Sequence, residues 1–132
     1  MSVTVTPQAN GGSFFTVLVH LEQDGEDKGE LKDYVIVDPA EFGLPKYPSL
    51  KLWEAWSSLV WFDVILKFGG LHPRPVWVFS REASAHPCFA SIGGLADRGE
   101  SPPSDDNGKI LLSTSGFDVP GSQGTLLLHF KK

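Results

Sequence analysis

The sequence predicts an all-β protein, an antiparallel β-sandwich or jelly-roll-like single domain spanning residues 1–132. Apolar residues recur at every second position in several segments, which is the period of a strand. Fourteen glycines and ten prolines in 132 residues, about half again the usual share, supply many turns. No long stretch shows a convincing helical period. Seven or eight short strands at fairly regular spacing fit two packed sheets or a barrel.

The strands are expected where apolar residues alternate with polar ones or form short runs between turn residues. In chain order they cover approximately residues 2–6, 13–22, 30–38, 50–56, 60–68, 76–79, 108–114 and 125–130. Pro7 follows the first strand, because a residue without a backbone N–H suits an edge or a strand end. Residues 8–12 are then a turn. In the second strand the odd-numbered residues from Phe15 to Leu21 form the face that should point into the core.

The connecting segments contain residues that disfavour regular structure. Three prolines fall within residues 39–49, although Pro39–Phe42 could form one helical turn. Residues 81–98 are expected to be a loop with a brief extended piece near residues 88–92. Residues 99–107, GESPPSDDN, are expected to be an exposed loop.

The rest of the chain is organised around residues 51–68, KLWEAWSSLVWFDVILKF, which hold three of the four tryptophans. We interpret this stretch as a hairpin with strands at 50–56 and 60–68. Its turn would be Ser57-Ser58-Leu59, since serine hydroxyls can bond nearby backbone groups. A helix over the first half is the alternative. The residues that would share one face of that helix are Leu52, Trp53, Trp56, Leu59 and Val60.

The second strand of the expected hairpin has two different sides. The side assigned to the core consists of Val60, Phe62, Val64, Leu66 and Phe68. The other side carries Trp61, Asp63, Ile65 and Lys67, which is more apolar than an ordinary solvated face. Because tryptophan is enriched in buried interface centres, we expect a contact surface for another chain or for a sugar ring. The candidate interface residues are Trp53, Trp61, Ile65 and Trp77. The alternative is that a loop such as residues 39–49 covers this side.

Charge and cysteine content narrow the class of protein. A net charge of −5 argues against a nucleic-acid partner, which requires a basic face. The one cysteine, Cys88, excludes an intrachain disulfide and favours a reducing origin. We expect no signal peptide and no membrane span, since no basic region precedes an apolar run and no apolar stretch approaches 18 residues.

The sequence contains no motif that indicates catalysis. None of the four histidines has zinc-site spacing, and His86 with Cys88 supplies only two ligands. The acidic turns match no calcium loop, and the glycine–serine segments near residues 115 and 122 lack the G-x-S-x-G spacing. We therefore expect a protein that is not an enzyme, with no catalytic, cofactor-binding or metal-binding residue. A hydrolase with a site hidden from sequence is a further hypothesis.

Two stretches, residues 51–68 and residues 108–132 (GKILLSTSGFDVPGSQGTLLLHFKK), resemble small all-β virion structural proteins of tailed bacteriophages. These include head-decoration, or cement, proteins. The resemblance lies in strand and turn style and in the short basic tail, and it covers about a third of the chain. It carries over no site residue.

The resemblance implies a non-enzymatic capsid decoration protein in the virion, assembled in the host cytoplasm. Such a protein would be a homo-oligomer, with a trimer favoured, bound to the major capsid protein or another virion protein. It would have no nucleic-acid or membrane partner. The alternative function is a carbohydrate-binding β-sandwich module that uses exposed tryptophans.

Overall fold

The computed structural model describes residues 2–24, 29–44, 50–70, 73–81, 84–96 and 106–132, with only the backbone at residues 106 and 107. Its strands are β1 (Ser2–Gly11), β2 (Phe14–Glu22), β3 (Tyr34–Val37), β4 (Lys51–Val60), β5 (Asp63–Gly70), β6 (Arg74–Phe79), β7 (Asp106–Ser115) and β8 (Gln123–Lys131). Two 3-10 turns, η1 (Pro39–Phe42) and η2 (Ala90–Ile92), are the helical elements of the described residues.

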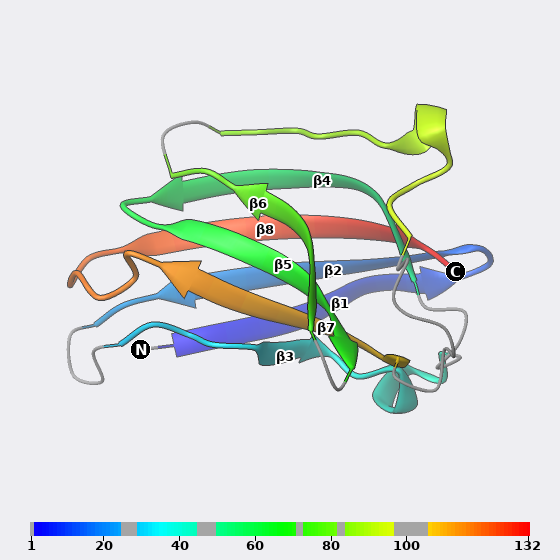
Figure 1. The fold of residues 1–132 in the computed structure, drawn as a ribbon, viewed down its shortest axis with the longest axis horizontal. Coiled ribbons are helices and arrows are strands. Elements are labelled where there is room, and N and C mark those ends of the chain that lie inside the picture. The colour runs from blue at the N-terminus through cyan, green and yellow to red at the C-terminus, as the bar shows by residue number, and fades with distance from the viewer. Residues whose placement is uncertain (1, 25–28, 45–49, 71–72, 82–83, 97–105) are drawn as a thin grey trace.

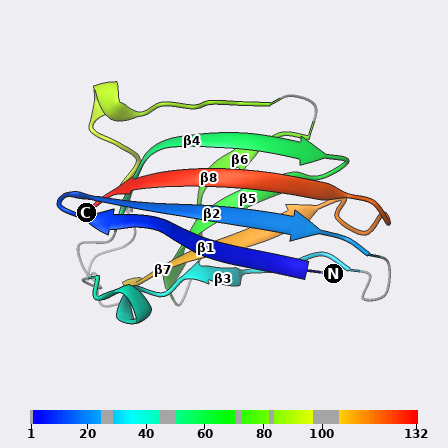
Figure 2. The same cartoon turned by 180° about the vertical axis from the view of Figure 1, so that it is seen from behind.

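The strands form two antiparallel sheets of four, stacked as two layers (Figures 1 and 2). Sheet A has the order β1-β2-β8-β4, and sheet B has the order β3-β7-β5-β6. Figure 2 looks onto sheet A, in which β8 lies between β2 and β4. The predicted all-β antiparallel sandwich is therefore confirmed.

The core fills the space between the sheets, and the period of two in each strand explains it. In β2 the odd-numbered residues from Phe15 to Leu21 are buried, as predicted. The inner faces of the other strands add further large apolar side chains. The largest of these are Leu52, Phe62, Leu66, Phe79, Ile110, Leu112, Phe117, Leu126, Leu128 and Phe130.

The predicted hairpin within residues 50–68 is wrong, and so is the helix alternative. Strand β4 continues through Ser57-Ser58-Leu59 to Val60 and pairs with β8 along its length, so these residues form no turn. Strand β5 belongs to sheet B, and the chain passes between the sheets at Trp61 and Phe62.

The passage between sheets depends on an unusual backbone at Trp61. Its φ is 74°, in the left-handed region that non-glycine residues rarely occupy. Phe62 then enters the core and packs on Phe117 with ring centroids 4.5 Å apart. Val60 precedes this reversal and faces out, 39% exposed, so its assignment to the core was wrong. Val64, Leu66 and Phe68 are buried as predicted.

Other boundaries differ from the prediction for local reasons. Strand β1 runs on through Pro7 to Gly11, because a bulge between Pro7 and Ala9 accommodates the proline in an edge strand. Residues 8–11 are therefore strand, and the turn follows at Gly12 and Ser13.

The connections can be compared with the prediction only in part. The helical turn at Pro39–Phe42 is confirmed, and the Asp38 side chain accepts a hydrogen bond from the Ala40 N–H at 3.2 Å. The predicted loop at 99–107 lies outside the described residues up to position 105, and its last two residues belong to β7.

Candidate functional site

The free edge of β4 is covered by residues 84–95, which we call the edge segment (Figure 1). Ser57 and Ala85 exchange two backbone hydrogen bonds, of 2.8 and 3.1 Å. Leu52 and Leu95 exchange two more, of 2.9 and 2.8 Å. The edge segment therefore acts as an irregular fifth strand that protects the edge of sheet A from pairing with other chains.

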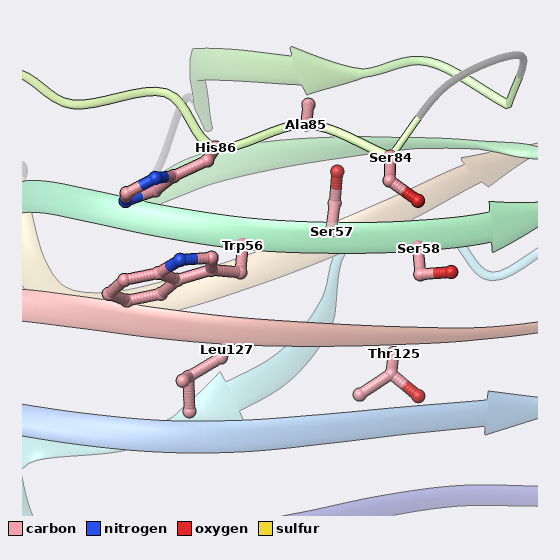
Figure 3. A pocket seen from close by; sticks show the side chains of 8 residues that line it. All are labelled: Trp56, Ser57, Ser58, Ser84, Ala85, His86, Thr125 and Leu127. Atoms are coloured by element: carbon pink, nitrogen blue, oxygen red, sulfur yellow. The ribbon is translucent and has the colours of Figure 1, made fainter.

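A groove of about 390 Å³ lies where the edge segment meets the outer face of β4 and β8 (Figure 3). Its lining combines one large aromatic ring with small hydroxyl residues. The lining residues are Trp56, Ser57, Ser58, Ser84, Ala85, His86, Thr125 and Leu127. They contain no lysine, arginine, aspartate or glutamate.

An aromatic stack forms one end of this groove. The rings of Trp56 and His86 lie 4.4 Å apart at an interplanar angle of 15° (Figure 3). The edge of the imidazole has a contact as well, since His86 Nε2 lies 3.1 Å from Glu54 Oε2. Trp56 still keeps 37% of its surface exposed. The indole is thus held in a fixed position while part of it remains available for a ligand.

Hydroxyl groups provide the polar part of the groove. Thr125 Oγ1 lies 3.0 Å from His20 Nδ1 on the neighbouring strand β2. Ser57 is only 5% exposed, and its Oγ has no hydrogen-bond partner in the described part of the chain. A buried hydroxyl without a partner is destabilising, and such groups are rare in native proteins.

A second aromatic cluster lies further along the same outer face. A bulge between Leu52 and Glu54 leaves Trp53 as an extra residue in β4. Trp53 packs edge-on against Phe14 at 5.8 Å, and Lys131 Nζ lies 4.8 Å from the centre of the indole. Bulges re-aim side chains in this way and are common beside functional sites.

The four residues predicted to form an interface do not lie together. Trp53 lies on the outer face of sheet A, and Trp61 lies at the passage between the sheets, 55% exposed. Ile65 lies on the outer face of sheet B, opposite Val78. Trp77 is 39% exposed at the edge of sheet B, where it packs edge-on against Phe89 with ring centroids 4.9 Å apart. Sequence reasoning missed the pairing of Trp56 with His86, because only the path of the edge segment brings residue 86 to residue 56.

The alternative cover for this side, residues 39–49, is found elsewhere in its described part. Phe42 packs on Phe15 with ring centroids 5.1 Å apart, and its carbonyl accepts a hydrogen bond from Asn10 Nδ2 at 3.0 Å. These contacts place η1 at the end of sheet A. Residues 45–49 lie outside the described residues.

The charges on the outer face of sheet B are paired with loop residues. Asp63 Oδ2 lies 3.1 Å from Arg81 Nη2, and Lys67 Nζ lies 2.8 Å from Asp33 Oδ1. The hydrogen bond from Arg81 lowers the pKa of Asp63, with help from its backbone N–H and its charge. The hydrogen bond from Lys67 likewise lowers the pKa of Asp33, aided by the lysine charge and Ser113. These pairs join neighbouring segments of the fold.

The described residues contain no group of three or more histidine, cysteine, aspartate or glutamate side chains placed to hold a metal ion. They also contain no helix that is long and apolar enough to cross a membrane.

Comparisons with known proteins identify no family for this chain. No family model matches the sequence, and no curated protein matches it either. The chain is similar to a solved structure described as "Crystal Structure of CoII HppE in Complex with Tris Buffer", at 10% identity and a TM-score of 0.34. The match covers 97% of this chain and 53% of that one, so this chain spans about half the length of that protein. A likeness at this level supports no inference about function.

Proposed function

We propose that this protein is a non-enzymatic carbohydrate-binding module whose groove beside Trp56 takes a sugar ring. The observation that carries the proposal is the half-exposed Trp56 indole set among hydroxyl groups in a groove of about 390 Å³. Of the functions expected from the sequence, this is the one that the lining of the groove supports.

The chemistry of the lining suits a sugar. A pyranose presents C–H groups on its ring faces, and these pack favourably against the negative face of an indole. Its hydroxyls both donate and accept, as do the hydroxyls of Ser58, Ser84 and Thr125. A groove of about 390 Å³ falls in the lower part of the range for small-ligand sites. It therefore has room for one or two sugar rings.

The groove is also built to bind without rearrangement. Trp56 and Thr125 lie on paired strands, and His86 is held by both the indole and Glu54. A site on strands with locked side chains loses little conformational entropy when a ligand arrives.

The lining supports binding and not hydrolysis. Glycoside hydrolysis commonly uses two carboxyl groups that flank the scissile bond. Among the described residues no carboxylate lines the groove, and the neighbouring Glu54 is directed to His86. This is the basis for proposing a module without enzymatic activity.

A glycan array, followed by titration calorimetry on the best ligand, tests the proposal. Trp56→Ala should weaken binding at least about tenfold, since stacking on an aromatic side chain contributes about 1–3 kcal/mol by analogy with bases. Trp56→Phe should keep part of the affinity. Trp61→Ala is the matched control, because Trp61 is more exposed but lies outside the groove. Absence of any glycan ligand, or equal losses in Trp56→Ala and Trp61→Ala, would refute the proposal.

The capsid decoration function is a second candidate, favoured by the edge strand β6. Val78 is 57% exposed, and a hollow of about 370 Å³ is lined by Pro75, Val76, Trp77 and Val78. An exposed apolar edge strand is a template for pairing with another chain. It could serve the homo-oligomer, with a trimer favoured, or the contact with a capsid protein in the virion.

Sedimentation at micromolar concentration tests this second candidate. Wild-type protein should sediment as an oligomer, and Val78→Lys should be monomeric because a charge on the edge opposes pairing. The double variant Trp61→Ser, Ile65→Ser examines the surface first expected from the sequence. A monomeric wild type that also fails to bind phage capsids would exclude the decoration function.

A further inference from the structure

The outer face of sheet A extends from the groove beside Trp56 to a pair of lysines. In the pairing of β4 with β8, Trp56 lies opposite Leu127 and Lys51 lies opposite Lys131. Four residues of β8 separate these two rows, which corresponds to about 13 Å along the strand. Both rows lie on the same face, because Leu52 and Phe130 beside the lysines point into the core.

The lysine pair is unusual in this acidic protein. Like charges directly opposite each other across two strands are destabilising. Neither Lys51 nor Lys131 has an ion-pair partner within the described residues. A cation–π contact with Trp53 accounts for the position of Lys131, but not for the choice of lysine at position 51.

The surroundings pack against the Lys131 ammonium group and against the base of the Lys51 side chain. Trp53 leans on Phe14, and Phe14 in turn stacks on His129 with ring centroids 4.7 Å apart. Gly94 of the edge segment packs behind them: a Cβ there would lie 3.2 Å from both Lys51 Cβ and Trp53 Cε3. The two lysines therefore lie on strands that pack against neighbouring side chains, and not on loops.

One acidic side chain and one histidine lie on this face between the Trp56 row and the Lys51 row. Glu54 is the one described carboxylate on the outer face of sheet A between the Trp56 and Lys51 rows, and it contacts His86. His129 Nδ1 lies 2.7 Å from Thr16 Oγ1, which leaves the other ring nitrogen for a ligand. The part of this face at Lys51 and Lys131 is thus the place where an anionic group would be stabilised.

We infer that the ligand is an anionic oligosaccharide: one sugar ring occupies the groove beside Trp56, and a carboxylate or sulfate further along the chain binds Lys51 and Lys131. This inference rests on the proposed function and names its ligand class. The spacing requires a ligand longer than a single sugar, and about three linked units would span it. A nucleic acid is disfavoured, because two lysines on a chain of net charge −5 provide little phosphate neutralisation.

The experiment compares ligands that differ only in charge. Binding of an oligogalacturonate and of its methyl-esterified, neutral form would be measured by calorimetry, with a sulfated oligosaccharide as a third ligand. The anionic ligands should bind about tenfold tighter than the neutral one at low salt, and the advantage should shrink as salt rises. The sulfated ligand distinguishes a carboxylate preference from a sulfate preference.

Variants then locate the charge recognition. The double variant Lys51→Gln, Lys131→Gln should remove the preference, so that the anionic ligands bind no more tightly than the neutral one. Lys32→Gln is the matched control, because Lys32 is an exposed lysine on the sheet B side of the chain. Circular dichroism would show that the variants remain folded.

The outcomes distinguish a failure of this inference from a failure of the proposed carbohydrate-binding function. Equal affinity for charged and neutral ligands, with binding still abolished by Trp56→Ala, would overturn the inference and keep the carbohydrate-binding function. A charge preference that survives in the double lysine variant would also overturn it. Failure of every oligosaccharide to bind would overturn both.

Discussion

The two outer faces of the sandwich cover the same core but are built differently. The outer face of sheet A carries stacked aromatic rings, histidine–threonine pairs and a groove. The outer face of sheet B carries Asp63 and Lys67, each paired with a residue from a neighbouring segment. The comparison teaches that the charged groups on sheet B bond within the protein, whereas the groove on sheet A is lined by an exposed indole and by hydroxyl groups.

The difference follows from what each face has to hold. Arg81 follows β6 and bonds both Asp63 and the Ser115 carbonyl, so it joins the ends of β5 and β7. Asp33 precedes β3 and accepts from Lys67 and Ser113. On sheet A, backbone hydrogen bonds from the edge segment do the joining at β4. The side chains on the outer face of sheet A are therefore not needed to connect the edge segment to β4, and they make other contacts.

The largest expected effect comes from a change in the core that both faces share. In Gly124→Ala the new Cβ would lie 2.5 Å from Leu59 Cδ2 and 2.8 Å from Phe62 Cζ. Overpacking of this kind should lower the free energy of unfolding by about 2–3 kcal/mol, measured by urea denaturation. Gly11→Ala, with no atom within 4 Å of its new Cβ, should change it little. Equal stability of the two variants would show that the core yields at this point.

A smaller effect is expected on the outer face of sheet B. Asp63→Asn removes the ion pair with Arg81, in which both side chains are partly exposed. The free energy of unfolding should fall by about 0.5–1 kcal/mol, and glycan affinity should be unchanged. The exposed Asp118→Asn provides the control. Loss of glycan binding in Asp63→Asn would break the division of roles between the faces.

The smallest effect is the pH dependence of stability that arises from the same face. The pKa values of Asp33 and Asp63 are lowered in the folded protein by Lys67 and Arg81, respectively. Their contribution is fully present above the ordinary pKa of an unfolded aspartate. It is lost as the pH falls through the lower folded values. Thermal unfolding in acid should therefore be less pH-dependent in Asp33→Asn, Asp63→Asn than in wild type, and identical slopes would contradict this.

The alternation of apolar residues was enough to predict the class of fold and the buried face of β2. It was not enough to place the change of sheet after β4. Ser57 and Ser58 have the composition of a turn, yet Ser57 is buried in a strand because β8 and the edge segment pair on either side of it. The reversal occurs instead at Trp61, whose aromatic side chain gives no local sign of a left-handed backbone.

The candidate site was less predictable than the fold. The tryptophans were predicted to form a contact surface for protein or sugar. The four residues predicted for that surface are instead spread over both sheets and the passage between them. Trp56 and His86 are thirty positions apart, and the edge segment that joins them has no apolar period to indicate a strand. Its contacts with β4 are isolated bridges made by backbone groups, which residue types do not reveal.

The position of β8 has a consequence for how the protein acquires its structure. It is the last strand in chain order but lies inside sheet A, where its pairing joins residues as far apart as Phe14 and Lys131. Folds dominated by such distant pairings fold slowly. During synthesis the edges of β2 and β4 that pair with β8 stay unpaired until β8 has been synthesised. Aggregation is most expected in this interval. The groove is formed by β4 and β8, so a ligand bound in it would slow unfolding far more than it would speed folding.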